Sequence, residues 1–226
     1  MDVLVTGCDT ELGRAVAAGF CDAGHNVVLA GRRRDELKVA AKDLEVGDGQ
    51  VIVFDNCDPA SIAAVQGHFP AHLDAIVNVP VPKWSGGDPR TYTLADHATE
   101  WRNIYDSNLV SAVLTVQVLG DHLRSGGSVV TVIPDPAREG SADAAVKAAI
   151  SEWTAGQANH FGTRGITVNA VAAGRGIEPG YEGMGRTPPS VSAEIARVSL
   201  FLATPAARHI TGQTLHVSHG ALANFR

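Results

Sequence analysis

The sequence predicts one doubly wound α/β domain, in which a Rossmann-type parallel sheet of seven strands carries helices on both faces. Short runs rich in Val and Ile alternate with segments of helical period, which is the pattern of βαβ units. The first run leads through the glycine-containing loop TGCDTELGR into a helix. The length of 226 residues suits a single domain over residues 1–226.

Each expected strand is a short apolar run, and each expected helix follows one. The strands are expected at Asp2–Thr6, Asn26–Ala30, Gln50–Phe54, Ala75–Val79, Ser128–Ile133, Thr167–Val171 and Thr214–Val217. The helices are expected at about Leu12–Ala23, Arg34–Asp43, Pro59–His68, Glu100–Leu123, Ser141–Phe161 and Ser192–Leu202. Right-handed crossovers then cover both sheet faces. Ligands bind outside the carboxyl ends of such strands, so the Pro- and Gly-rich segments Val79–Arg90 and Ala173–Pro189 are expected to wall a site.

Composition excludes several classes of function. With 45% hydrophobic and 19% charged residues, the chain has the balance of a globular protein. Its net charge of -6 gives no general attraction to nucleic acid or to an anionic membrane. No apolar stretch is long enough to span a bilayer and no signal peptide precedes the first strand, so a cytoplasmic protein is expected.

No metal site is predicted. Cys8, Cys21 and Cys57 are too far apart for usual zinc spacings, and we expect them to be buried thiols. His68 and His72 have the spacing of two helical ligands, but Pro70 between them breaks the helix.

The loop TGCDTELGR has the position of a dinucleotide-binding loop. Gly7 lies at the turn, and Gly13 lies where the helix packs on the sheet. In such loops a middle glycine lets backbone N–H groups approach the pyrophosphate, and Glu11 stands in its place. A carboxylate about 4 Å from a phosphate charge costs on the order of 4 kcal/mol at an effective dielectric near 20. Glu11 therefore weakens the expected binding, unless its side chain points to solvent.

The second expected strand ends in AGRRR, where an adenosine ribose would lie. An acid there binds a free ribose hydroxyl, whereas an arginine accommodates a 2′-phosphate. Arg32 therefore favours NADP(H) over NAD(H), although such a turn is also commonly a solvated loop.

Several segments match one family in order and spacing: TGCDTELGR, LAGRR, FDNCDP, LDAIVNVPV, DSNLVSA, AVKAA, ITVNAVAAG and LFLATPAARHITGQTLHV. Together they resemble the short-chain dehydrogenase/reductase family, of the classical single-domain kind, over nearly the whole chain. The resemblance implies a nicotinamide dinucleotide and a set of cofactor contacts. These are Gly7, Leu12, Gly13, Arg32, Asp55, Asn56, Asn78 and Lys147.

The resemblance also implies a reaction centre of an Asn, a Ser, a Tyr and a Lys. In that family the tyrosine gives a proton to the carbonyl oxygen, the lysine lowers the pKa of the tyrosine and holds the nicotinamide ribose, and the serine polarises the carbonyl. Asn108 and Lys147 match their positions. Pro134 stands where the serine would be and Asp143 where the tyrosine would be, so the site is expected to be degenerate.

Asp143 is a poor substitute for the tyrosine. An unperturbed Asp has a pKa of about 3.9, and a lysine one turn along favours its ionised form. An ion pair between Asp143 and Lys147 is therefore more strongly expected than a catalytic dyad. Tyr92 and Tyr181, in the expected site walls, are weaker candidates for a phenol.

Three hypotheses follow. In the first, the chain is a nucleotide-binding, regulatory or non-catalytic partner subunit without standard carbonyl-reductase chemistry. In the second, it is an active NADP-dependent oxidoreductase with a nonstandard acid such as Asp143, Tyr181 or a water on Lys147. In the third, it is a structural homo-oligomer that binds no nucleotide because of Glu11. The resemblance implies a homo-oligomer, dimer or tetramer, through the helices at Glu100–Leu123 and Ser141–Phe161, and a mixed oligomer is an alternative. The expected ligand is a dinucleotide or another small molecule.

Overall fold

Seven parallel strands form one sheet, in the order β3-β2-β1-β4-β5-β6-β7. The computed structural model describes residues 1–81, 89–133, 141–173 and 191–217. The strands are β1 Asp2–Val5, β2 Asn26–Gly31, β3 Val51–Val53, β4 Leu73–Asn78, β5 Leu123–Ile133, β6 Thr167–Ala173 and β7 Thr214–Val217. The predicted fold class, a seven-stranded parallel sheet, is confirmed.

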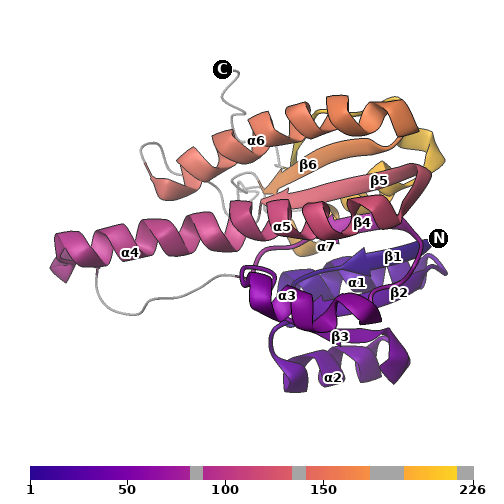
Figure 1. The fold of residues 1–226 in the computed structure, drawn as a ribbon, viewed down its shortest axis with the longest axis horizontal. Helices are drawn as coiled ribbons and strands as arrows, with labels where there is room; N and C mark the ends of the chain where they lie inside the picture. Colours follow the sequence, from indigo (N-terminus) through magenta and orange to yellow (C-terminus); the bar gives the residue numbers. More distant parts are fainter. Residues whose placement is uncertain (82–88, 134–140, 174–190, 218–226) are drawn as a thin grey trace, which may run out of the picture.

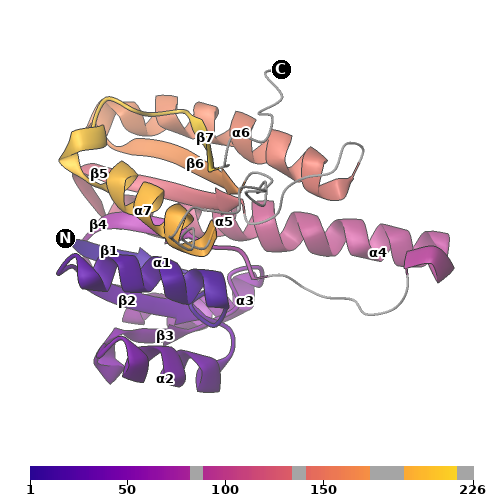
Figure 2. The same cartoon turned by 180° about the vertical axis from the view of Figure 1, so that it is seen from behind.

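Helices cover both faces of the sheet. They are α1 Glu11–Asp22, α2 Arg34–Asp43, α3 Pro59–Val65, α4 Leu94–Tyr105, α5 Ser111–Leu119, α6 Ala142–Phe161 and α7 Val191–Ala203. Figure 1 shows α3, α5 and α6 in front of the sheet. Figure 2 shows α1, α2 and α7 on the opposite face.

The hydrophobic core has one layer on each side of the sheet. Phe20, Leu37 and Ile195 pack with alternate strand residues on the face of α1, α2 and α7. Ile62, Val116 and Phe161 pack on the face of α3, α5 and α6. All seven residues of β6 are buried, as expected for a parallel strand covered on both faces.

The strand order reverses between β1 and β4, and this is the switch point at which such sheets bind ligands. Hydrogen bonds join the segments that follow the two strands. Val79 donates its backbone N–H to Thr6 Oγ1 at 3.0 Å, and that hydroxyl donates to the Val79 carbonyl at 3.2 Å. A ligand of such a sheet is therefore expected beside the loop that follows Thr6.

The prediction of one long helix at Glu100–Leu123 is wrong at both ends and in the interior of the helix. It begins six residues earlier, because Thr93 and Asp96 form a capping box: Thr93 N–H donates to Asp96 Oδ2 at 2.8 Å, and Asp96 N–H donates to Thr93 Oγ1 at 3.2 Å. A π-helical turn at Asp106–Val110 then separates α4 from α5. A 3₁₀ turn, Gly120–His122, leads directly into β5. The N-terminal part of α4 projects from the body of the molecule (Figure 1).

Smaller corrections concern strand ends and cysteines. Strand β5 begins at Leu123 rather than Ser128, since Leu123 pairs with Leu73 before a register shift. Helix α3 ends at Val65 and continues as a 3₁₀ turn to His68. Cys8 is buried as expected, whereas Cys21 and Cys57 are only half-buried.

Two features are absent from the ranges that the structure describes. In those ranges no group of three or more His, Cys, Asp or Glu side chains is placed to hold a metal ion. None of the helices there is both long and apolar enough to cross a membrane.

Candidate functional site

The loop between β1 and α1 is built around two glycines that leave no room for a side chain. Gly7 has a φ of 67°, and a Cβ there would lie 2.4 Å from the carbonyl oxygen of Val79. A Cβ on Gly13 would lie only 2.0 Å from the carbonyl oxygen of Gly7. Helix α1 therefore packs directly on the loop, at the switch point of the sheet.

The start of α1 presents two backbone N–H groups. Thr10 caps the helix: its Oγ1 accepts from Gly13 N–H at 3.0 Å and donates to the Gly7 carbonyl at 2.8 Å. The N–H groups of Glu11 and Leu12 have no hydrogen-bond partner in the described part of the chain. Free N–H groups at the positive end of a helix form an anion site, so this loop fits a pyrophosphate.

Glu11 is exposed on the first turn of α1. Its carboxylate makes no ion pair within the ranges that the structure describes. An acid on the first turn stabilises a helix through the dipole, and this accounts for Glu11 without a role in binding.

The segment after β2 carries arginines that already face carboxylates. Arg32, just after β2, lies with NH1 3.9 Å from Asp55 Oδ2. Arg33 donates from Nε to Asp9 Oδ2 at 3.1 Å and lies 4.0 Å from Glu36. Both arginines therefore face acids, a feature that the run AGRRR alone did not reveal.

Asp55 and Asn56 lie just after β3, beside Arg32. Asp55 Oδ1 accepts from Cys57 N–H at 2.9 Å, and Asp55 N–H donates to Ser61 Oγ at 2.9 Å. Asn56 is buried. These bonds order the segment, and they leave Asp55 Oδ2 facing Arg32.

Asn78 ends β4 with a buried side-chain amide. Neither Oδ1 nor Nδ2 has a hydrogen-bond partner in the described part of the molecule. Buried amides are normally satisfied, so an orphan amide at the carboxyl end of a central strand points to a missing ligand or water. The observation is consistent with the predicted role of Asn78 in the site.

Asn108 lies in the π-helical turn between α4 and α5. Its Nδ2 donates to the Ile104 carbonyl at 2.9 Å and to Ser107 Oγ at 3.2 Å. Turns of this kind interrupt the helical ladder and are frequently found at functional sites. The turn lies against α6, the helix that carries Lys147.

Lys147 and Asp143 lie one turn apart near the start of α6. Burial lowers the pKa of Lys147. The expected ion pair is wrong: of the ion pairs within 4.0 Å among described residues, none joins Asp143 to Lys147. The lysine charge acts instead on His216 of β7, whose pKa is lowered by burial and then by Lys147.

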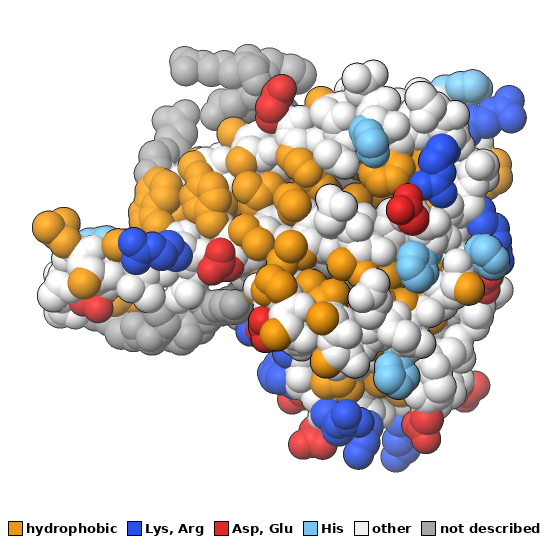
Figure 3. Space-filling model, viewed as in Figure 1, with side chains coloured by type: hydrophobic (Ala, Val, Ile, Leu, Met, Phe, Trp, Pro, Cys, Tyr) orange, Lys and Arg blue, Asp and Glu red, His pale blue; other side chains and the backbone are white. Residues whose placement is uncertain are grey.

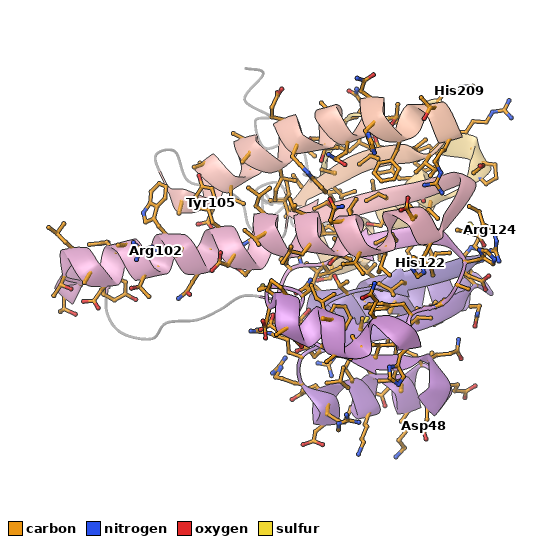
Figure 4. The ribbon with its side chains drawn as sticks, in the orientation of Figure 1. Asp48, Arg102, Tyr105, His122, Arg124 and His209 are labelled. Carbon is orange, nitrogen blue, oxygen red and sulfur yellow. The ribbon has the colours of Figure 1, made fainter. Side chains whose placement is uncertain are left out.

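His216 and Tyr105 are neighbours of this centre that the sequence-based analysis missed. Thr214, two residues before His216 on β7, donates to Ser151 Oγ of α6 at 2.9 Å, so this face of β7 meets the helix of Lys147. Tyr105 packs against the cluster that includes Val146, and its ring stacks on Trp101 with centroids 6.3 Å apart. Figure 4 shows Tyr105 on the side of α4 toward α6. Only the complete fold brings these residues to α6.

Other predicted residues are not brought to this centre. Tyr92 packs against His97, with ring centroids 5.5 Å apart, at the projecting end of α4. Pro134, Tyr181 and most of the two expected walls lie outside the described residues.

Comparisons with known proteins agree with this geometry. The family described as Enoyl-(Acyl carrier protein) reductase matches residues 8–221. A relative from Mycobacterium tuberculosis, named as an oxidoreductase, is 60% identical over 225 residues and covers 100% of both chains. The 3-oxoacyl-[acyl-carrier-protein] reductase of Staphylococcus aureus is 29% identical over 246 residues, covering 96% of each chain.

Solved structures share the fold. A short-chain dehydrogenase/reductase from Serratia marcescens has a TM-score of 0.75 at 24% identity, covering 97% of this chain and 96% of that one. The citronellol catabolism dehydrogenase of Pseudomonas aeruginosa has a TM-score of 0.77 at 24% identity, covering 97% and 94%. By sequence match along nearly its whole length, and by fold, the chain belongs to the short-chain dehydrogenase/reductase family.

Proposed function

We propose that the protein binds a nicotinamide dinucleotide in the crevice beside Gly7 and Gly13 but lacks the standard carbonyl-reductase chemistry of its family. It then acts as a nucleotide-binding, regulatory or non-catalytic partner subunit. The observation that carries this proposal is Asp143, which lies one turn before Lys147 on a helix that contains no tyrosine. Asp143 offers no phenol hydroxyl at the point where the family's tyrosine would give its proton.

The side chains that remain support binding better than turnover. A bound nicotinamide cofactor would supply the hydride. Among the described residues, the Leu12 N–H has no partner and could bind a pyrophosphate oxygen, and the buried amide of Asn78 has none either. Lys147 would hold a ribose hydroxyl, as the family resemblance implies. None of these groups replaces the serine hydroxyl that Pro134 lacks.

A second candidate is an active oxidoreductase with a nonstandard acid. The lowered pKa of Lys147 favours it, because an ammonium group that loses its proton more readily is a better general acid near neutral pH. Asp143 and a water on Lys147 remain candidates for this role, and Tyr105 is the described tyrosine packed nearest to α6. A Tyr105→Phe variant that keeps binding but loses measurable turnover would favour this second function.

The nucleotide preference depends on charges at the adenosine end. Arg32 favours a 2′-phosphate, as the sequence predicts, and the expected preference for NADP(H) depends on this residue. The carboxylates of Asp9 and Asp55 next to the arginines oppose a phosphate.

The proposed assembly is a homo-oligomer, with a mixed oligomer as the alternative that suits a non-catalytic subunit. Figure 3 shows hydrophobic side chains along α4 and the neighbouring helices on one face. Leu94 is 89% exposed and Trp101 is 42% exposed on α4. A cavity of 360 Å³ between α5 and α6 is lined in part by Trp153, which is half-buried. Exposed apolar surface of this kind is typical of an interface.

Titration with NADH and NADPH, followed by cofactor fluorescence, tests the proposal. We expect binding of at least one nucleotide without reduction of 3-oxoacyl thioesters or simple ketones. The Glu11→Gly variant is expected to bind both NADH and NADPH more tightly, and Glu11→Gln separates the effect of charge from that of the backbone. Unchanged affinity in both variants would mean that Glu11 faces away from the phosphates. Robust carbonyl reduction by the purified protein would refute the proposal, and absence of binding at millimolar nucleotide would favour a structural oligomer.

A further inference from the structure

Asp9, in the loop after β1, places its carboxylate at the end of β2. Its side chain is completely buried. A Cβ built on Gly31, the last residue of β2, would lie 2.4 Å from Asp9 Oδ1 and 2.9 Å from Asp9 Cγ. The carboxyl group of Asp9 thus fills the space that a side chain at position 31 would take.

This position has a known purpose in dinucleotide-binding folds. An acidic residue about 20 positions beyond the glycine loop accepts a hydrogen bond from the ribose 2′-hydroxyl. Gly31 supplies no side chain, and Arg32 follows it. The chain therefore has an acid at the ribose position after all, supplied by the phosphate loop rather than by β2.

The hydrogen bonds of Asp9 leave one oxygen open. Oδ2 accepts from Arg33 Nε at 3.1 Å and from Arg33 N–H at 3.3 Å, and Arg33 also donates to the Asp9 carbonyl. Oδ1 is buried with no partner in the described part of the chain. A buried carboxylate oxygen needs a donor. A ribose hydroxyl can donate to Oδ1, whereas an ionised phosphate ester has only acceptors.

Arg32 does not reverse this argument. Its Nε is also buried and unpartnered in the described residues, and it is a donor. A ribose diol can satisfy both groups, since one hydroxyl donates to Asp9 and an oxygen accepts from Arg32. A 2′-phosphate satisfies Arg32 alone and brings its charge toward the buried carboxylate.

The arginine nearest to Asp9 is not a free cation. Arg33 is engaged by Asp9 and lies 4.0 Å from Glu36. Its side chain is 55% exposed, so it can move aside when a ribose enters. Two of the three arginines of the run AGRRR, Arg32 and Arg33, thus already face carboxylates where a 2′-phosphate would lie.

We propose that Asp9 is the residue that sets nucleotide preference, and that it selects the free ribose of NAD(H) over the 2′-phosphate of NADP(H). The inference rests on the proposed function, since it concerns the same crevice. It reverses the preference that Arg32 alone predicts.

The test is a pair of titrations, with NADH and with NADPH, on the full chain. We expect wild type to bind NADH tighter by roughly tenfold or more, because like charges at a recognition site are strongly disfavoured. Asp9→Asn keeps the shape and removes the charge, and it should shrink or reverse the ratio of the two dissociation constants. Asp22→Asn, exposed at the end of α1, is the matched control and should leave the ratio unchanged.

A second measurement does not depend on the folding of the variant. Competition of ADP and of adenosine 2′,5′-bisphosphate against bound cofactor in wild type should favour ADP. If wild type binds NADPH as tightly as NADH or more tightly, the inference is overturned while the proposed function stands. An unchanged ratio in a folded Asp9→Asn protein also overturns it. If neither dinucleotide binds at millimolar concentration, the proposed function fails and the inference fails with it.

Discussion

Replacing Gly13 by alanine tests how tightly α1 packs on the phosphate loop. The new Cβ would lie 2.0 Å from the Gly7 carbonyl oxygen, 2.4 Å from its carbon and 2.9 Å from Cys8 N, whereas ordinary contact begins at 3.4 Å. All three atoms belong to the backbone. The loop has little room to retreat, because Gly7 is itself pressed against the Val79 carbonyl. The helix and the loop must therefore separate.

The magnitude follows from two opposing effects. Overpacking a site that moves only by shifting the backbone costs about 3 kcal/mol. Alanine regains roughly 0.5–1 kcal/mol relative to glycine in a helix. The net loss of about 2 kcal/mol lowers the Tm of a domain of this size by roughly 4–8 °C.

The assay compares Gly13→Ala with Gly156→Ala, by urea unfolding and by cofactor titration. Gly156 lies in α6, and a Cβ there meets nothing within 4 Å. We expect Gly156→Ala to stabilise the protein by about 0.5–1 kcal/mol and to leave binding unchanged. Gly13→Ala should lose both stability and dinucleotide affinity, since the Leu12 N–H moves with the helix. If the two variants have equal stability and equal affinity, the described packing of the loop is refuted.

Three further predictions concern a cap, a thiol and a pH effect. Thr93→Ala removes the capping box of α4 and should cost about 1 kcal/mol, with faster hydrogen exchange confined to the first turns of α4; uniform exchange rates across the variant would contradict it. Burial raises the pKa of Cys8 to about 12, so Cys8 should resist iodoacetamide at pH 8 until the protein unfolds, and labelling of Cys8 in the native state would contradict its burial. The pKa of His216 is lowered from 6.5 by burial and by Lys147, so the folded state favours neutral His216, and the associated stability is lost as the pH falls through 6.5 toward the folded pKa. NMR titration should show this pKa rising in Lys147→Met, and an unchanged value would mean that the two side chains do not interact.

The order of strands and helices was predictable because each apolar run has a length and period that suit only one kind of element. The bounds of α4 were not predicted correctly, although the capping pair Thr93 and Asp96 is visible in the sequence as a T-x-x-D pattern. The π-helical turn at Asn108, which contacts α6, has no such pattern in the sequence.

At the site, local sequence predicted the backbone features and missed the long-range pairings. Gly7 and Gly13 were identified from spacing, and their close approaches explain why no larger residue fits. The pairing of Asp9 with Arg33 joins residues 24 apart in the chain, and the approach of His216 to Lys147 joins an edge strand to a helix. Because neither contact leaves a periodic signal, the sequence did not reveal the acid that engages Arg33, and it predicted an Asp143–Lys147 ion pair that the described residues do not form.

The central claim is that this chain binds a nicotinamide dinucleotide without performing the standard reduction. A single-turnover experiment tests it directly: purified protein in excess over NADH is mixed with a 3-oxoacyl thioester, and cofactor fluorescence and nicotinamide absorbance are followed together. We expect the fluorescence of bound NADH with no decay of its absorbance over many minutes. Rapid loss of absorbance on adding the thioester would contradict this claim. It would show that the protein reduces the carbonyl although it lacks the tyrosine and serine of its family.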